Sequence, residues 1–403
     1  MLTSVGVPVE SEAEHSAPDQ NRPTLLCFSH LRWDFVFQRP QHLMGRFADE
    51  MTVVFWEEPM PLPAGEPAML RVRTAEEHPQ VRIVVPHLPE GLSEEQRTTA
   101  LKRLLDAYSA GLSRPLVAWY YTPMMLPFSR DLDADATVFD SMDELSKFRF
   151  APAELLDLEQ ELIDRSDLVF TGGSSLYEAK KDRHDSVHLF PSSVDRAHFE
   201  RARKAVPEPE DQASIPHPRL GFYGVIDERF DIELLDEAAR MRPDWSFVMV
   251  GPVVKISEDE LPKRPNIHYL GGKKYEQLPS YLSGWDVALM PFAMNESTQF
   301  ISPTKTPEYL AGGKPVVSTP VRDVVRHYGQ LEGVGIAATP AEFVEQCERM
   351  LKLDRDGDWL AEADLLLSAT SWATTQARMA GLIGEILGER SESDSSALLV
   401  AAE

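Results

Sequence analysis

The sequence predicts an α/β protein made of two doubly wound domains of near-equal size, with a ligand site between them. Short, continuously apolar segments alternate with helical patterns along most of the chain, which is typical of parallel strands covered by helices on both faces. The alternation stops at the proline- and charge-rich segment 203–218 and then starts again. A length of 403 residues suits two or three domains.

The individual elements follow from this alternation. The strands expected before the proline-rich segment lie at 24–29, 52–56, 81–85, 116–121, 136–140, 168–172 and 187–190, with helices at 38–49, 94–111, 152–165 and 174–182. The strands expected after it lie at 220–225, 246–250, 267–270, 287–291, 315–319 and 334–337, with helices at 231–240, 275–283, 304–312, 321–328, 339–352 and 357–387. A ligand is then expected at the carboxyl ends of the strands, between the domains.

Composition gives the expected boundaries. They are a disordered polar tail over 1–22, a first Rossmann-like domain over 23–200, a linker over 201–218, a second Rossmann-like domain over 219–370, a helix over 371–388 that returns to the first domain, and a disordered tail over 389–403. We identify no internal repeat and no coiled-coil heptad.

Net charge and cysteine content exclude several classes of function. The formal charge of −25 opposes nucleic acid as a partner, although it leaves room for a local basic pocket. No long apolar run predicts a spanning helix, and the N-terminus lacks the pattern of a secretory signal. Cys27 and Cys347 sit in apolar patterns and are expected to be buried thiols. A cytoplasmic location is expected, with docking on the inner face of the membrane left open.

The segment 295–318 carries the most chemical information. A helix is expected to begin near Thr304, with Pro307 in its first turn, and to end at a glycine pair before a buried strand. Free amides at such a helix start attract a diphosphate, and Lys305 adds a positive charge there. Glu308 can accept hydrogen bonds from two ribose hydroxyls. The alternative is an ordinary surface ion pair between Lys305 and Glu308.

Four segments in order resemble the GT-B glycosyltransferases. TKTPEYLAGGKPVVST resembles the family signature, GFYGVIDER (221–229) resembles its glycine turn, DVALMPF (286–292) its late strand, and PSSVDRAHF (191–199) the close of its first domain. HLRWDFVFQRPQHLM (30–44) and VFDSMDELSKFRF (138–150) resemble a bacterial subgroup, the teichuronic acid glycosyltransferases of surface-glycan and cell-wall synthesis. The resemblance implies a GT-B fold of two Rossmann-like domains facing a central cleft.

The resemblance also implies a donor site on the second domain. Glu308 would hold the ribose, Lys305 and Arg229 the diphosphate, and Gly224 would give the diphosphate room. The other residues of the implied donor site are Thr304 at the helix start, Tyr269, Leu270 and Gly271 beside the base, and Tyr275 as a stacking neighbour. Arg229 can instead pair with Asp227 or Asp231. Phe300 stands where many relatives have a second Glu, with Glu296 and Gln299 nearby, so the grip on the transferred sugar stays open.

The loop after the first strand is expected to bind the acceptor, because it lies at the carboxyl end of a strand. The candidate acceptor residues are Arg32, Trp33, Asp34, Gln38, Arg39 and His42. In this interpretation Trp33 stacks on a sugar ring, while the arginines and Gln38 bind hydroxyls or a phosphate. The alternative places Trp33 and Phe35 in the core.

Acidic residues and glycines in other loops suggest further roles. Asp140 or Asp143, after the strand at 136–140, can act as general base, or each can cap a helix. The turn at 171–178 (TGGSSLYE) can bind a phosphate or cap a helix. The Asp-rich segment 131–136 is expected to be a solvated loop, so neither a metal ion nor another cofactor is predicted.

The sequence therefore predicts a metal-independent hexosyltransferase. Its donor is a nucleoside diphosphate sugar of the UDP or GDP type, and its acceptor is a glycan or lipid-linked sugar in bacterial polysaccharide or cell-wall synthesis. Lys305 would have a catalytic role, because it stabilises the charge of the leaving diphosphate. Two alternatives remain: a nucleotide-sugar epimerase of the same fold, and a non-catalytic protein that binds a nucleotide or a sugar.

Overall fold

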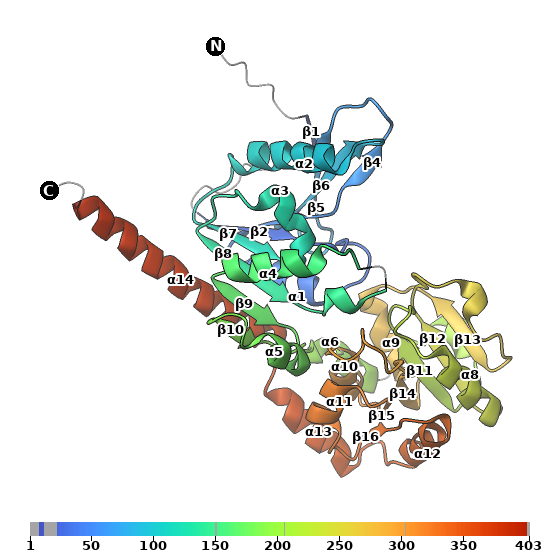
Figure 1. The fold of residues 1–403 in the computed structure, drawn as a ribbon. Helices are drawn as coiled ribbons and strands as arrows, with labels where there is room; N and C mark the ends of the chain where they lie inside the picture. The colour runs from blue at the N-terminus through green and yellow to red at the C-terminus, as the bar shows by residue number, and fades with distance from the viewer. Residues whose placement is uncertain (1–7, 12–21, 150, 205, 303, 401–403) are drawn as a thin grey trace.

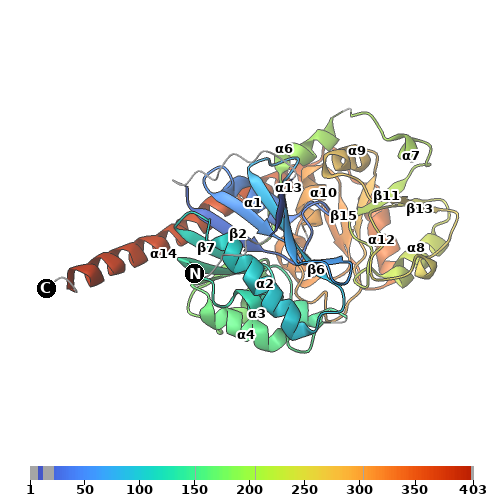
Figure 2. The same ribbon diagram turned by 90° about the horizontal axis from the view of Figure 1, so that it is seen from above.

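Two α/β domains, each with its own sheet, make up the protein (Figure 1). The computed structural model describes residues 8–11, 22–149, 151–204, 206–302 and 304–400. Seen from above, helices lie on both sides of the sheets, and one long helix projects away from the body (Figure 2).

The sheet of the N-terminal domain runs in the order β1-β5-β6-β3-β2-β7-β8-β9-β10, with β4 on β6. Its strands are β1 (Val9–Ser11), β2 (Thr24–Phe28), β3 (Thr52–Trp56), β4 (Met60–Leu62), β5 (Met69–Thr74), β6 (Val81–Pro89), β7 (Leu116–Tyr120), β8 (Ala136–Ser141), β9 (Leu168–Thr171) and β10 (Val187–Leu189). Neighbouring strands are parallel except for β5 and β6. The order reverses direction between β2 and β7, which is where an open parallel sheet binds its ligand.

Helices cover both faces of this sheet, and successive residues of a strand pack on opposite faces. Leu25 and Cys27 of β2 belong to one apolar cluster, whereas Leu26 and Phe28 belong to another. The helical segments of this half are α1 (Arg39–Phe47), α2 (Glu94–Ser109), η1 (Pro123–Met125), α3 (Leu126–Ser129), η2 (Leu145–Lys147), α4 (Leu155–Arg165) and α5 (Ser174–Lys180). Burial on both faces explains why the strands are apolar throughout.

The sheet of the C-terminal domain is fully parallel and runs β13-β12-β11-β14-β15-β16, the doubly wound order. Its strands are β11 (Arg219–Tyr223), β12 (Ser246–Val250), β13 (Ile267–Gly271), β14 (Val287–Met290), β15 (Val316–Ser318) and β16 (Val334–Ile336). Its helical segments are α8 (Ile232–Met241), η4 (Glu258–Glu260), η5 (Tyr275–Gln277), α9 (Leu278–Ser283), α10 (Lys305–Ala311), α11 (Arg322–Tyr328), α12 (Pro340–Met350) and α13 (Asp358–Ser368).

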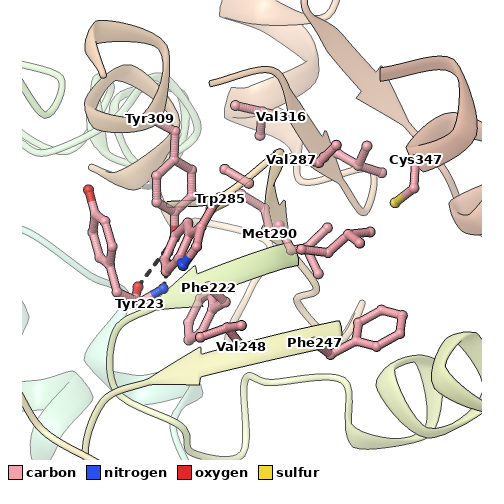
Figure 3. Packing of buried hydrophobic residues seen from close by; sticks show 14 of the residues in the cluster. Phe222, Tyr223, Phe247, Val248, Trp285, Val287, Met290, Tyr309, Val316 and Cys347 are labelled. Atoms are coloured by element: carbon pink, nitrogen blue, oxygen red, sulfur yellow. Dashed lines mark hydrogen bonds between the residues drawn. The ribbon is translucent and has the colours of Figure 1, made fainter. Parts of the chain in front are cut away.

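Close packing of aromatic rings positions helix α10 on this sheet. The Tyr309 hydroxyl accepts a hydrogen bond from the backbone N–H of Tyr223 at 3.1 Å, and Trp285 lies beside both rings (Figure 3). A Cβ atom on Gly221 would lie 2.0 Å from the Trp285 ring, so only glycine fits there. The core thus fixes the helix that begins at Lys305.

The chain crosses between the domains twice. On the first crossing, Phe190 still packs in the N-terminal core, whereas Val194 and Phe199 already pack in the C-terminal core, ahead of the expected boundary at residue 200. The connecting segment holds α6 (Arg196–Phe199), η3 (Glu200–Arg203) and α7 (Glu210–Ala213). On the second crossing, α14 (Trp372–Val400) returns to the N-terminal domain, and Met379 is fully buried in that domain's core (Figure 1).

The ends of the chain differ from the expectation. The expected disordered tail over 389–403 is wrong for 389–400, because α14 continues to Val400 and Arg390 donates to Asp167 at 2.7 Å. The expected helix over 357–387 is two helices, since Ser371 caps the start of α14 through the N–H of Thr374. Of the expected tail over 1–22, residues 9–11 form strand β1, and 1–7 and 12–21 lie outside the described residues, as do 401–403. Among the described helices none is long and apolar enough to cross a membrane.

Candidate active site

Loops from the carboxyl ends of both sheets meet at the domain interface. Phe37, after β2, stacks on Tyr275, after β13, with ring centroids 4.5 Å apart. Phe148, after β8, lies beneath the guanidinium of Arg229 and the amino group of Lys255, which follow β11 and β12. The carboxyl ends of the two sheets therefore face each other across the interface. Doubly wound folds bind their ligands at these ends.

The start of α10 brings two of the predicted donor residues together. Gly224 has φ +146°, and a Cβ atom there would lie 2.3 Å from Cε of Lys305. Glycine is favoured here because a φ of +146° is strained for other residues, and the lack of a side chain leaves room for the end of the lysine side chain. Thr304 directly precedes the helix and has no capping hydrogen bond through its side chain.

Lys305 is a partly buried cation. Among the residues that the structure describes, it forms no ion pair and no side-chain hydrogen bond. Burial lowers its pKa, while the nearby carboxylates of Glu308, Asp227 and Asp143 act in the opposite direction. An ammonium group without a direct partner at a helix start is suited to hold phosphate oxygens.

Glu308 occupies the next turn of the same helix. Its side chain accepts a hydrogen bond from the Tyr223 hydroxyl at 2.8 Å, and the residue is 8% exposed. Burial raises the pKa of Glu308 to about 7, although Lys305 and the Tyr223 hydroxyl act against this rise. The second carboxylate oxygen is left to accept from a ligand hydroxyl.

Arg229 is paired with a carboxylate of its own loop. Its guanidinium binds both carboxylate oxygens of Asp227, with the shortest distance 2.7 Å, and lies 5.3 Å from the centre of the Phe148 ring. The alternative pairing weighed from the sequence is therefore the one present, while Asp231 caps α8 instead. The pKa of Arg229 is raised by this pairing, against the effect of burial.

The residues expected around the base have different surroundings. Gly271 ends β13 with φ +70°, and the Tyr269 hydroxyl donates to the carbonyl of Pro262 at 3.2 Å. The Tyr275 ring is not free to stack on a base, because Phe37 and His198 already stack on it. Their ring centroids lie 4.5 and 4.2 Å from that of Tyr275. The expectation that Tyr275 stacks on a base is corrected for this reason.

The two candidate general bases have opposite environments. Asp140 is completely buried, and both of its oxygens accept from Arg39, at 2.8 and 2.9 Å. This ion pair makes Asp140 part of the core and unsuited to act as a base. Asp143 lies in the electrostatic range of Arg229, Lys255 and Lys305 across the interface, and burial raises its pKa. Of the two residues, only Asp143 therefore remains a candidate for the general base.

The expected acceptor residues mostly hold the N-terminal domain together. Trp33 is 3% exposed and packs edge-on against Phe55, so stacking of its ring on a sugar is corrected in favour of the core alternative. Arg39 also donates to the carbonyl of Phe190, and His42 stacks on Trp372 of α14 at 4.6 Å, so neither binds an acceptor in this arrangement.

The remaining acceptor candidates lie nearer the surface. Arg32 pairs with Glu57 at 2.9 Å, and Asp34 pairs with Arg73. Gln38 is the residue before α1, and its backbone N–H donates to the Gln41 side chain at 3.0 Å. Phe35, expected as core in the alternative interpretation, is instead 52% exposed.

The glycine turn at 171–178 is occupied by a residue from the other domain. Asp323, at the start of α11, accepts from the backbone N–H groups of Ser174 and Ser175, at 2.8 and 3.1 Å, and from the Ser175 hydroxyl at 2.7 Å. A carboxylate thus takes the place expected for a phosphate. No sequence signal links these residues, since Asp323 lies 149 positions after Ser174.

Two further residues at the interface were not among the predicted site residues. Lys255 has φ +66°, a conformation that is rare for non-glycine residues and that clusters at functional sites. Nδ1 of His30 is buried without a hydrogen-bond partner among the described residues, and burial lowers the pKa of His30 to about 4. The position of His30 directly after β2 was the available signal.

No carboxylate of the described residues 295–302 pairs with a predicted donor residue. Glu296 is exposed and pairs with Lys147 at 3.4 Å, and Gln299 is exposed. The Asn295 side chain accepts from the N–H groups of Ser297 and Thr298, so these amides are already bonded.

The acidic residues of the described chain show no metal-type cluster. No group of three or more His, Cys, Asp or Glu side chains in that part could hold a metal ion. In the Asp-rich segment 131–136, Asp133 and Asp135 pair with Arg114. Metal independence nevertheless stays a prediction.

Known proteins share both the sequence signature and the fold. Residues 217–353 match the family "Glycosyl transferases group 1". A Bacillus subtilis (strain 168) protein, "Putative teichuronic acid biosynthesis glycosyltransferase TuaH", is 27% identical over 261 residues, which cover 59% of this chain and 64% of that protein, just under two thirds of its length.

The fold resembles that of several solved structures at low sequence identity. Sucrose-phosphate synthase from Thermosynechococcus elongatus matches with a TM-score of 0.67, 16% identity, and coverage of 91% of this chain and 100% of the other. Anabaena Alr3699/HepE in complex with UDP and glucose matches with a TM-score of 0.65, 12% identity, and coverage of 89% and 99%. Residues 217–353 therefore resemble the group 1 glycosyltransferases, and the chain as a whole has the two-domain GT-B fold of these solved structures.

Proposed function

We propose that the protein transfers a hexose from a nucleoside diphosphate sugar to a glycan or lipid-linked acceptor, without a metal ion. The observation that carries this proposal is the start of α10. There Lys305, which has no ion pair among the described residues, lies against Gly224, and a buried Glu308 follows one turn later. Lys305 suits a diphosphate and Glu308 suits the ribose hydroxyls. The UDP-bound structures of similar fold make UDP the first nucleoside diphosphate to test.

The proposed reaction is a displacement at the anomeric carbon of the donor. A bond forms between an acceptor hydroxyl oxygen and this carbon, while the bond from the carbon to the diphosphate oxygen breaks. Lys305 and the α10 amides stabilise the charge that develops on the leaving diphosphate. Asp143, across the interface, takes the proton from the acceptor hydroxyl, and its raised pKa suits a group that binds this proton.

The similarity to TuaH supports a role in bacterial surface-glycan or cell-wall synthesis. We further propose that the protein acts in the cytoplasm, at the inner face of the membrane. A nucleotide-sugar epimerase of the same plan would act on donor alone. Product analysis with and without candidate acceptors distinguishes these activities, because only a transferase forms a new glycosidic bond to the acceptor.

Calorimetric binding of UDP, GDP, ADP and TDP to wild type and to Glu308→Ala tests the donor site. We expect one diphosphate to bind and the variant to lose about 1–3 kcal/mol of binding free energy, as for a charge-assisted hydrogen bond. Glu296→Ala is the matched control, since Glu296 is exposed and pairs only with Lys147 in the described chain. Equal binding by wild type and Glu308→Ala would contradict the proposed site.

A further inference from the structure

The Tyr275 ring joins the two domains next to the proposed donor site. Phe37 of the N-terminal domain stacks on it at 4.5 Å with an angle of 24° between the planes, and His198 of α6 stacks on it at 4.2 Å and 8°. Nε2 of His198 also lies 3.0 Å from the Tyr275 carbonyl oxygen. The position of this ring therefore depends on residues from both domains.

The Tyr275 hydroxyl is buried in the folded protein. Among the residues that the structure describes, nothing forms a hydrogen bond with it. A buried phenol normally finds a partner, because an unsatisfied polar group costs about 1–3 kcal/mol. A partner from outside the protein, a water molecule or a ligand hydroxyl, would satisfy this group.

Two observations relate this hydroxyl to the proposed ribose site. Burial raises the pKa of Tyr275, and Glu308 is the carboxylate that adds most to this rise. A chain of rings connects the two residues: Phe199 lies 5.7 Å from the Tyr275 ring and 6.1 Å from the Tyr223 ring, and the Tyr223 hydroxyl donates to Glu308.

We propose that the Tyr275 hydroxyl hydrogen-bonds a ribose hydroxyl of the nucleotide held by Glu308, and that Phe37 of the acceptor domain keeps it in place. This inference rests on the proposed function, because it needs a nucleotide at Glu308. Stacking on the base is left to other groups, since Phe37 and His198 already stack on the ring. The N-terminal domain would thus take part in donor binding without touching the donor.

The chemistry of ribose suits this pair of residues. A carboxylate can only accept hydrogen bonds, whereas a phenol can also donate one, and each ribose hydroxyl both donates and accepts. Glu308 can then accept from the ribose while Tyr275 donates to it. A site that pairs polar groups in this way rejects an analogue lacking the hydroxyl, because its own groups are left unpaired.

The test uses Tyr275→Phe, which removes only the oxygen atom. Calorimetry is done with the nucleoside diphosphate that binds wild type and with its 2′-deoxy and 3′-deoxy forms. We expect the variant to bind the ribose form about ten-fold more weakly. We also expect it to lose most of the preference over one deoxy form, which a purely structural role of Tyr275 would leave unchanged.

Tyr281→Phe is the matched control, because the Tyr281 hydroxyl donates to Asp211 at 2.7 Å and has no place in the proposed donor site. Phe37→Leu tests the coupling between domains: it should weaken binding of the ribose form, and combining it with Tyr275→Phe should add little, since both act through one hydroxyl. Thermal unfolding of each variant shows that it is folded.

The outcomes separate this inference from the proposed function. If no nucleoside diphosphate binds wild type, the proposed function fails and the inference fails with it. If wild type binds, Glu308→Ala loses binding, and Tyr275→Phe keeps both affinity and preference, only the role of Tyr275 is overturned. Fully additive effects of Phe37→Leu and Tyr275→Phe would overturn the coupling through Phe37.

Discussion

Replacing Glu308 by glutamine separates the function of this carboxylate from its effect on stability. The residue is 8% exposed, accepts a hydrogen bond from Tyr223 at 2.8 Å, and has a pKa raised by burial from 4.5 to about 7. Glutamine has nearly the same shape, and its carbonyl can accept the same bond. The substitution therefore removes the charge and little else.

The direction of the pH dependence follows from the raised pKa. The folded protein binds the Glu308 proton more tightly than the unfolded chain does, so stability falls as pH rises from about 4.5 to about 7. Each pKa unit corresponds to about 1.4 kcal/mol, so the folded state is destabilised by up to about 3 kcal/mol above pH 7. Glu308→Gln lacks this loss and should be the more stable protein at pH 8.

The assay is urea unfolding of wild type and Glu308→Gln between pH 4.5 and pH 8, without nucleotide. The difference in unfolding free energy should grow through this interval and then level off. Nucleoside diphosphate binding should change in the opposite sense, because the variant binds weakly at pH 8 while wild type loses affinity only as Glu308 is protonated below pH 7.

A difference in stability that does not change with pH would refute the reasoning, because Glu308 would then titrate as an exposed carboxyl does. Glu296→Gln provides the control, since Glu296 is exposed and its removal should leave the pH profile unchanged.

Three other substitutions test the remaining assignments. Arg39→Met should lower the unfolding free energy by about 3–5 kcal/mol, as for a broken buried ion pair, and adding Asp140→Leu should recover most of it in urea unfolding. No recovery would argue against a structural pair. Lys305→Met should weaken diphosphate binding about 10- to 100-fold in calorimetry, with unchanged affinity contradicting the site. Asp323→Ala removes the cap on α5 and should loosen the domains, seen as a larger radius of gyration in small-angle scattering, whereas Asp131→Ala should not.

The structure confirms the alternation of strands and helices read from the sequence. Parallel strands covered on both faces must be apolar throughout, so strands such as β2 and β12 were evident from their residues alone. The helix α10, which carries Lys305 and Glu308, was also predictable from neighbouring residues. A proline marks its first turn and a glycine pair marks its end. The antiparallel strand β5 lacks a continuous apolar run and was not predicted.

The residues of the N-terminal loops received their roles only from the tertiary structure. Arg39 meets Asp140 across 101 positions of sequence, and Ser174 meets Asp323 across 149. A charged residue at the end of a strand looks the same in sequence whether it faces a ligand or a buried partner. The sequence by itself therefore determined the fold and the position of the helix that carries Lys305 and Glu308, whose signals lie within a few turns of the chain. Which charges are paired, and which stay free for a ligand, was decided by contacts between distant segments that form only when both domains fold and dock.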